Sequence, residues 1–111
     1  MVSSNYASGS AASARLPISF HPEAYEFAEM GFIPAGAYRN REYAEQGVNV
    51  IGNVSRAMQD ICYDPQTSGG LLIAVAQEAA EACLAELRSV IPQAAKVGYV
   101  TERMDAAIYL E

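Results

Sequence analysis

A continuous apolar run at residues 71–76 restricts the fold more than any other feature of the sequence. The run follows directly on Gly69 and Gly70 and is too short for a buried helix, which needs about 10–12 residues. Short apolar runs bounded by turn residues are typical of strands that are covered on both faces. We therefore expect residues 71–76 to form the central strand of the domain.

Helix and strand patterns alternate on either side of this run. Helical spacing of apolar residues predicts helices over residues 22–30, 54–63 and 77–91, and the cap of the second is either Asn53 or Ser55. Alternation predicts strands over residues 15–20, 48–51, 96–101 and 107–110. The last two strands are expected to form a hairpin. These patterns indicate an α+β fold, in which helices pack on a mixed β-sheet of about four strands.

The glycine-rich stretch over residues 31–52 interrupts these patterns. Five Gly and Pro residues punctuate it, so we expect a long and mostly irregular connection apart from the short strand at residues 48–51. Long loops inside small domains are often functional, which makes this stretch a candidate for binding.

The chain has the size of one domain, with 111 residues. Residues 1–13 contain five Ser and no Leu, Ile or Phe, so they are expected to be a disordered or artificially added lead-in. Residues 14–111 are then the single α+β domain.

The charge and the cysteine content exclude several functions. A net charge of −6 opposes binding to nucleic acids and to anionic membranes, and no apolar stretch approaches the length of a membrane span. Two cysteines, Cys62 and Cys83, are too few for a disulfide framework. The sequence also offers no cluster of metal ligands near either cysteine. We expect a protein of the reducing cytoplasm.

Residues 64–70 form the most unusual local string of the chain. It offers a carboxylate, two hydroxyls and two adjacent glycines: Asp64, Thr67, Ser68, Gly69 and Gly70. Adjacent glycines allow close backbone approach, and successive N–H groups can form a nest for an anion without basic side chains. The string does not fit a Walker A loop, because the glycines lead into a strand and no Lys follows. The alternative is a tight helix-to-strand turn.

Residues 38–42 hold the densest cluster of positive charge. Arg39, Asn40 and Arg41 lie together here, and arginine forks suit carboxylate or phosphate oxygens. The alternative is local pairing of the arginines with Glu42 and Glu45 on a solvated turn.

Two strings resemble one known family. Residues 64–75 (Asp-Pro-Gln-Thr-Ser-Gly-Gly-Leu-Leu-Ile-Ala-Val) resemble the C-terminal domain of the selenophosphate synthetases, also called selenide, water dikinases. Residues 29–42 resemble the family's upstream Gly-x-x-Pro-x-Gly-x-x-x-Asn segment. The resemblance implies the C-terminal fold of the aminoimidazole ribonucleotide synthetase superfamily. It also implies an ATP- and magnesium-dependent phosphotransferase that makes selenophosphate from selenide and releases AMP and phosphate.

The chain departs from that family by lacking its N-terminal half, which carries the reactive residue and the metal carboxylates. We therefore expect a piece of a longer enzyme that is inactive alone, binds no ATP or Mg²⁺ by itself and needs the N-terminal ATP-binding domain as its partner. A homodimer is also expected, because surface that the family covers would be exposed.

By this resemblance, residues 64–70 face a cleft between domains. Thr67, Ser68 and the amides of Gly69 and Gly70 are then the candidate anion contacts, with Arg39 and Asn40 as neighbours. Two other readings stay open, namely a stand-alone dimerising module and a different enzyme of the same superfamily.

Overall fold

Four short strands form one mixed sheet in the computed structural model, which describes residues 10–14, 20–102 and 104–111. The strands are β1 (Ser10–Ala14), β2 (Val48–Val50), β3 (Gly98–Glu102) and β4 (Ile108–Leu110). Their order is β2-β4-β1-β3. β1 runs antiparallel to β3, whereas β4 is parallel to both of its neighbours. Together with the helices, this sheet confirms the α+β class.

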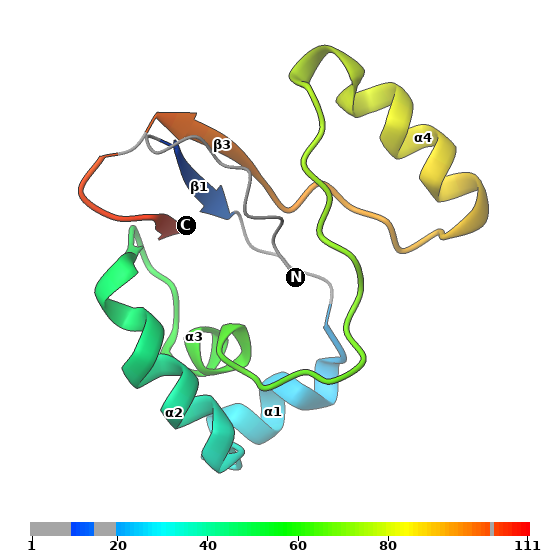
Figure 1. The fold of residues 1–111 in the computed structure, drawn as a ribbon. Coiled ribbons are helices and arrows are strands. Elements are labelled where there is room, and N and C mark those ends of the chain that lie inside the picture. The colour runs from blue at the N-terminus through cyan, green and yellow to red at the C-terminus, as the bar shows by residue number, and fades with distance from the viewer. Residues whose placement is uncertain (1–9, 15–19, 103) are drawn as a thin grey trace.

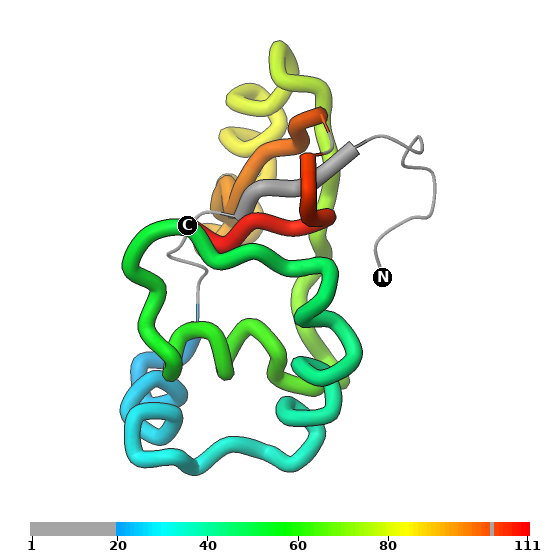
Figure 2. The backbone as a smooth tube through the Cα atoms, turned by 90° about the vertical axis from the view of Figure 1, so that its left-hand side faces the viewer, coloured from blue at the N-terminus to red at the C-terminus, as the bar shows by residue number. Residues whose placement is uncertain are grey.

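The helices fall into two groups that are separated in space. They are α1 (Pro22–Glu29), α2 (Ala35–Ala44), α3 (Arg56–Cys62) and α4 (Ala80–Val90), with 3-10 turns η1 (Glu45–Gly47) and η2 (Gln77–Ala79). Both views show α1, α2 and α3 gathered below the sheet and α4 above them (Figures 1 and 2). α3 packs against both α1 and α2, which makes it the centre of the lower group.

Local sequence explains where these helices begin and end. Pro22 occupies the first turn of α1, where its missing N–H costs nothing, and Gly31 follows the helix with a φ of 83°. α3 begins after Ser55, whose Oγ accepts a hydrogen bond of 3.2 Å from the backbone N–H of Met58. Ser55, and not Asn53, is therefore the cap.

The irregular connection predicted over residues 31–52 is wrong for half of its length, because α2 lies within it. Pro34 precedes the helix, and Gly36 stands in its first turn, where a glycine weakens a helix least. The residues that follow are mostly good helix formers such as Ala, Arg and Glu. Glycine punctuation here marks the ends of a helix, and the short strand predicted next is confirmed as β2.

The central strand predicted at residues 71–76 is also wrong. These residues belong to no helix or strand, and Leu71, Leu72 and Ile73 are 91%, 63% and 55% exposed. The stretch connects α3 with η2 along the side of the molecule (Figure 2). An apolar run indicates that a segment favours burial. A central strand also requires other elements to pack on both of its faces, and the run itself does not determine whether such elements are present.

The C-terminal strands are confirmed as β3 and β4, but they do not form a hairpin. β1 lies between them and pairs with both. Alternation predicts that a segment is a strand but not which strand it joins, which explains the error. β1 also includes residues that the sequence assigned to the lead-in. The strand predicted at residues 15–20 lies, except for Phe20, outside the described residues.

The buried part of the described chain is small. Its members are mainly alanines at helix contacts and residues of β4: Ala28, Ala37, Ala57, Ala106, Tyr109 and Leu110. The Tyr109 hydroxyl accepts a hydrogen bond of 2.9 Å from the Ala106 N–H and donates one to the Asp105 carboxylate, so the tyrosine closes the turn before its own strand. This hydrogen bond lowers the pKa of Asp105 and raises that of Tyr109.

Candidate functional site

Residues 64–70 leave the end of α3 as an exposed loop. Asp64 is half-buried, and residues 65–70 are exposed. The Gln66 N–H donates to the Asp64 carbonyl over 2.9 Å, which makes the first part of the loop a tight turn. A Cβ on Gly69 would lie 2.7 Å from Gln66 Oε1, so the glycine lets the glutamine side chain fold onto the loop. Close approach, rather than a positive φ, is what this glycine provides.

The structure brings the two motif strings together at the base of this loop. Asn40 of α2 donates from Nδ2 to the carbonyl oxygen of Tyr63 over 2.9 Å, one residue before Asp64. Gly36, one turn earlier in α2, lies against the ring of Pro65. α2 and residues 64–70 therefore form one structural unit, although they are more than twenty residues apart in sequence.

Arg41 has a role that sequence reasoning missed. Its Nη2 lies 2.5 Å from Asp60 Oδ1, and the two side chains are only 12% and 10% exposed. Its guanidinium carbon lies 4.7 Å from the centre of the Tyr63 ring, and Nη1 donates to Gln59 over 3.4 Å. The alternative prediction, that Arg41 pairs with Glu42 or Glu45, is therefore wrong: among the described residues its carboxylate partner is Asp60. The sequence signal that could have revealed this ion pair was Asp60, a carboxylate that stands between apolar residues of the helix predicted over residues 54–63.

The remaining candidate cation, Arg39, is exposed. Within the described part of the chain it makes no hydrogen bond or ion pair, unlike its neighbours in α2. The structure thus divides the cluster: Asn40 and Arg41 are engaged by the chain itself, and Arg39 keeps its guanidinium available to a ligand.

The electrostatics around α3 make Cys62 an inert group. Burial raises the pKa of the Cys62 thiol, and the neighbouring Arg41 only partly opposes this. Burial also raises the pKa of Tyr63, again against the effect of Arg41. Both groups are therefore neutral at pH 7, and a protonated thiol is a poor nucleophile and metal ligand.

The described residues do not fit a magnesium site. Among them, no group of three or more His, Cys, Asp or Glu side chains could hold a metal ion. Asp60, one helical turn before Asp64, is already paired with Arg41 and with Arg56, whose Nε lies 3.2 Å away. No described helix is long and apolar enough to cross a membrane.

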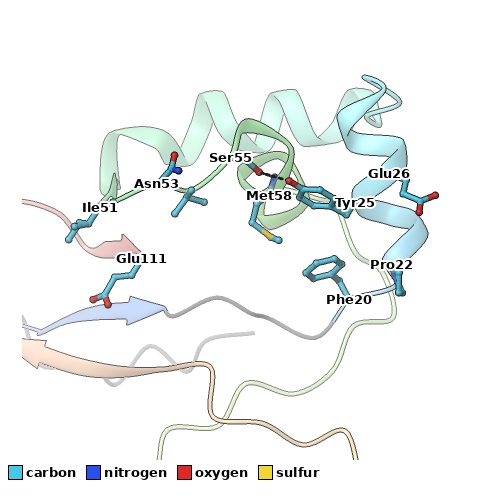
Figure 3. Close-up of a pocket in the computed structure, with 11 residues that line it drawn as sticks. Phe20, Pro22, Tyr25, Glu26, Ile51, Asn53, Ser55, Met58 and Glu111 are labelled. Carbon is cyan, nitrogen blue, oxygen red and sulfur yellow. Dashed lines mark hydrogen bonds between the residues drawn. The ribbon is translucent and has the colours of Figure 1, made fainter.

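A second feature that the sequence did not indicate is an open hollow of about 850 Å³. It lies between α1, α3 and the chain that follows β2 and β4, and Phe20, Tyr25 and Met58 point into it (Figure 3). The Tyr25 hydroxyl and Ser55 Oγ are 3.2 Å apart and tie α1 to α3 at its upper wall. Its lining is mainly apolar.

Comparison with known proteins identifies the class. Residues 7–111 match the family described as AIR synthase related protein, C-terminal domain, and the chain belongs to this family. No solved structure matches the chain.

Curated proteins similar to this chain include several selenide, water dikinases. The one from Pelobacter propionicus is 47% identical over 95 residues, which cover 85% of this chain and 27% of that relative. The one from Clostridioides difficile is 54% identical over 65 residues, covering 59% of this chain and 19% of the relative. Selenide, water dikinase 2 of Peptoclostridium acidaminophilum is 48% identical over 87 residues, covering 78% and 25%. The chain thus spans about a quarter of the length of these relatives.

Proposed function

We propose that this chain is the C-terminal domain of an ATP-dependent selenide, water dikinase. The intact enzyme makes selenophosphate from selenide and releases AMP and phosphate, and this domain is not catalytic alone. The proposal is supported by the similarity to proteins of that name over most of the chain. The single observation that carries the site is that α2 meets the start of the loop, through Asn40 at the Tyr63 carbonyl and Gly36 at the Pro65 ring.

The chemistry of the loop suits an anionic group. Thr67 and Ser68 are exposed hydroxyls, and Gly69 and Gly70 are exposed with no bulk to shield their N–H groups. Backbone and hydroxyl donors of this kind hold phosphate-like oxygens without positive side chains, which suits an acidic protein. Arg39 supplies the one further cation that we assign to the site.

The rest of the catalytic machinery belongs to the N-terminal ATP-binding domain in this proposal. ATP and Mg²⁺ serve the intact enzyme, and the described residues offer no carboxylate cluster for the metal. Phosphoryl transfer depends on positioning and on neutralised charge, so the loop contributes orientation of an anion and no covalent step. We place the enzyme in the cytoplasm, with no nucleic acid or membrane among its partners.

Complementation tests the proposal. The chain is mixed with the purified N-terminal part of the Pelobacter propionicus relative, and selenide-dependent AMP release is measured at increasing concentrations of both. We expect activity that neither part has alone, and less of it with a Thr67→Val, Ser68→Ala double variant. The relative's own C-terminal part is the positive control. If that control works and the chain gives no gain at any concentration, the proposed function is wrong.

A second role, homodimerisation, is favoured by the exposed apolar run. Leu71, Leu72, Ile73 and Val75 are 91%, 63%, 55% and 41% exposed, and no charged residue lies between Asp64 and Glu78. Burying each such side chain contributes about 1.5–3 kcal/mol, and self-pairing of an uncharged run meets no repulsion. Sedimentation should show a dimer for the chain and a monomer for Leu72→Lys. A monomeric chain at high concentration would contradict this role.

A further inference from the structure

We infer that Asn40 and Arg41 are positioning residues that set the direction in which residues 64–70 leave α3. The geometry of this inference stands on the structure alone. Its consequence for catalysis rests on the proposed function, because only a ligand or reaction at the loop makes its direction matter.

Three positions along α2 contact three successive points of the chain that leads into the loop. Arg41 forms an ion pair with Asp60, and Asn40 donates a hydrogen bond to the Tyr63 carbonyl. The Pro65 ring packs against Gly36. The order of the contacts along α2 is the reverse of their order along this segment. The helix and the segment therefore run side by side in opposite directions. Asp60 fixes the last turn of α3 against α2, and the contacts at Tyr63 and Pro65 then set the direction in which the following segment leaves α3.

The guanidinium of Arg41 makes several of these contacts at once. It pairs with Asp60 and donates to Gln59 while lying over the Tyr63 ring. A planar fork can combine these contacts, whereas a lysine ammonium is a point charge that keeps only the ion pair. Because the side chain is only 12% exposed, Arg41 acts on the loop through Tyr63 and not as a ligand of an anion.

The position of residues 67–70 depends on the contacts between α2 and the segment before them. Asp64 and Gln66 donate backbone hydrogen bonds to Ile61 and Asp64 over 3.1 and 2.9 Å. From residue 67 to residue 70, no backbone N–H within the described chain donates to another protein group. These free N–H groups are the ones available to an anion, and their placement follows from the anchored end.

The first experiment examines the folded chain by amide NMR, with Arg41→Lys and Asn40→Asp compared against the control Asn49→Asp. Asn49 lies exposed on β2, so the control makes the same change of charge away from the loop. We expect both test variants to shift the amide signals of residues 67–70 while the signals of the sheet stay in place. The control should leave the loop signals unchanged.

The second readout separates positioning from stability. In the complementation assay, each test variant should lower kcat/KM about fivefold, which corresponds to one good hydrogen bond or cation–π contact, while Asn49→Asp leaves it unchanged. Because the lost contact also lowers the unfolding midpoint, the assay is run at a temperature at which circular dichroism shows every variant to be folded. If either variant fails to fold, Asn40→Ser, which removes the donor without adding charge, replaces it.

The outcomes distinguish the two proposals. Failure of the unmodified chain to complement contradicts the proposed function, and the NMR comparison still decides the positioning role. Loop signals that stay unchanged in folded Arg41→Lys and Asn40→Asp would overturn the inference.

Discussion

Gly36 is the position at which the contact between α2 and the loop can be tested by a single methyl group. A Cβ at this residue would lie 2.7 Å from Cγ and 3.2 Å from Cβ of Pro65. Since carbon atoms in contact are normally about 3.5–4.0 Å apart, the closest approach is short by about 1 Å. Gly36→Ala must therefore displace the proline ring, and the loop with it.

The expected cost follows from two opposing effects. Overpacking of this kind destabilises a protein by about 1–3 kcal/mol. Replacing a helical glycine by alanine returns up to about 1 kcal/mol, and less in the first turn of a helix. We expect a net loss of about 1.5 kcal/mol, which lowers the melting temperature by roughly 6 °C in a domain of this size.

Thermal unfolding followed by circular dichroism measures this loss. Gly47→Ala is the matched control, because its nearest neighbour would be the Ala107 Cβ at an ordinary 3.9 Å. Pro65→Ala removes the Cγ contact at 2.7 Å and keeps only the Cβ contact at 3.2 Å, so most of the cost of Gly36→Ala should be absent from the double variant. If Gly36→Ala were as stable as the unmodified chain with Pro65 present, the packing argument would be refuted.

Two further predictions concern α3. Asp60→Asn should destabilise the chain by about 3 kcal/mol, because it leaves the guanidinium of Arg41 largely buried without a countercharge; urea unfolding measures this, and a loss no larger than that of Glu86→Gln on exposed α4 would contradict it. Stability should fall as the pH rises above about 8.5, because the unfolded Cys62 thiol loses its proton before the folded thiol, whose pKa is raised. Unfolding free energies between pH 7 and 10 test this, and Cys62→Ala should remove that part of the fall; an equal fall in the variant would refute it.

The sequence predicted local elements well where local chemistry determines them. α1 was predicted with its ends, and α3 with its start left open between Asn53 and Ser55, since a proline in the first turn, a serine cap and a following glycine act on the nearest residues. The errors arose where the answer depends on distant residues. Nothing in the alternation of residues 96–110 indicates that β1 separates the last two strands.

The candidate site shows the same division. The unusual composition of residues 64–70 and of residues 38–42 singled them out, but only the family resemblance suggested Asn40 as a neighbour of the loop, and its hydrogen bond to the Tyr63 carbonyl was not predicted. The structural role of Arg41 was missed, because an arginine beside two glutamates looks solvated until α3 supplies Asp60. Whether Thr67 to Gly70 bind an anion stays a prediction.

The place of β4 in the sheet has a consequence for how the protein is made. β2 pairs only with β4 among the described strands, although 57 residues lie between the end of β2 at Val50 and the start of β4 at Ile108. β1, the first of the described strands, likewise has no strand partner among them until β3 and β4 have been synthesised. The sheet therefore cannot assemble until β4 has been synthesised, and such distant contacts form late in folding. Replacing residues 108–110 by residues that cannot form a strand would leave β2 detached from the other described strands.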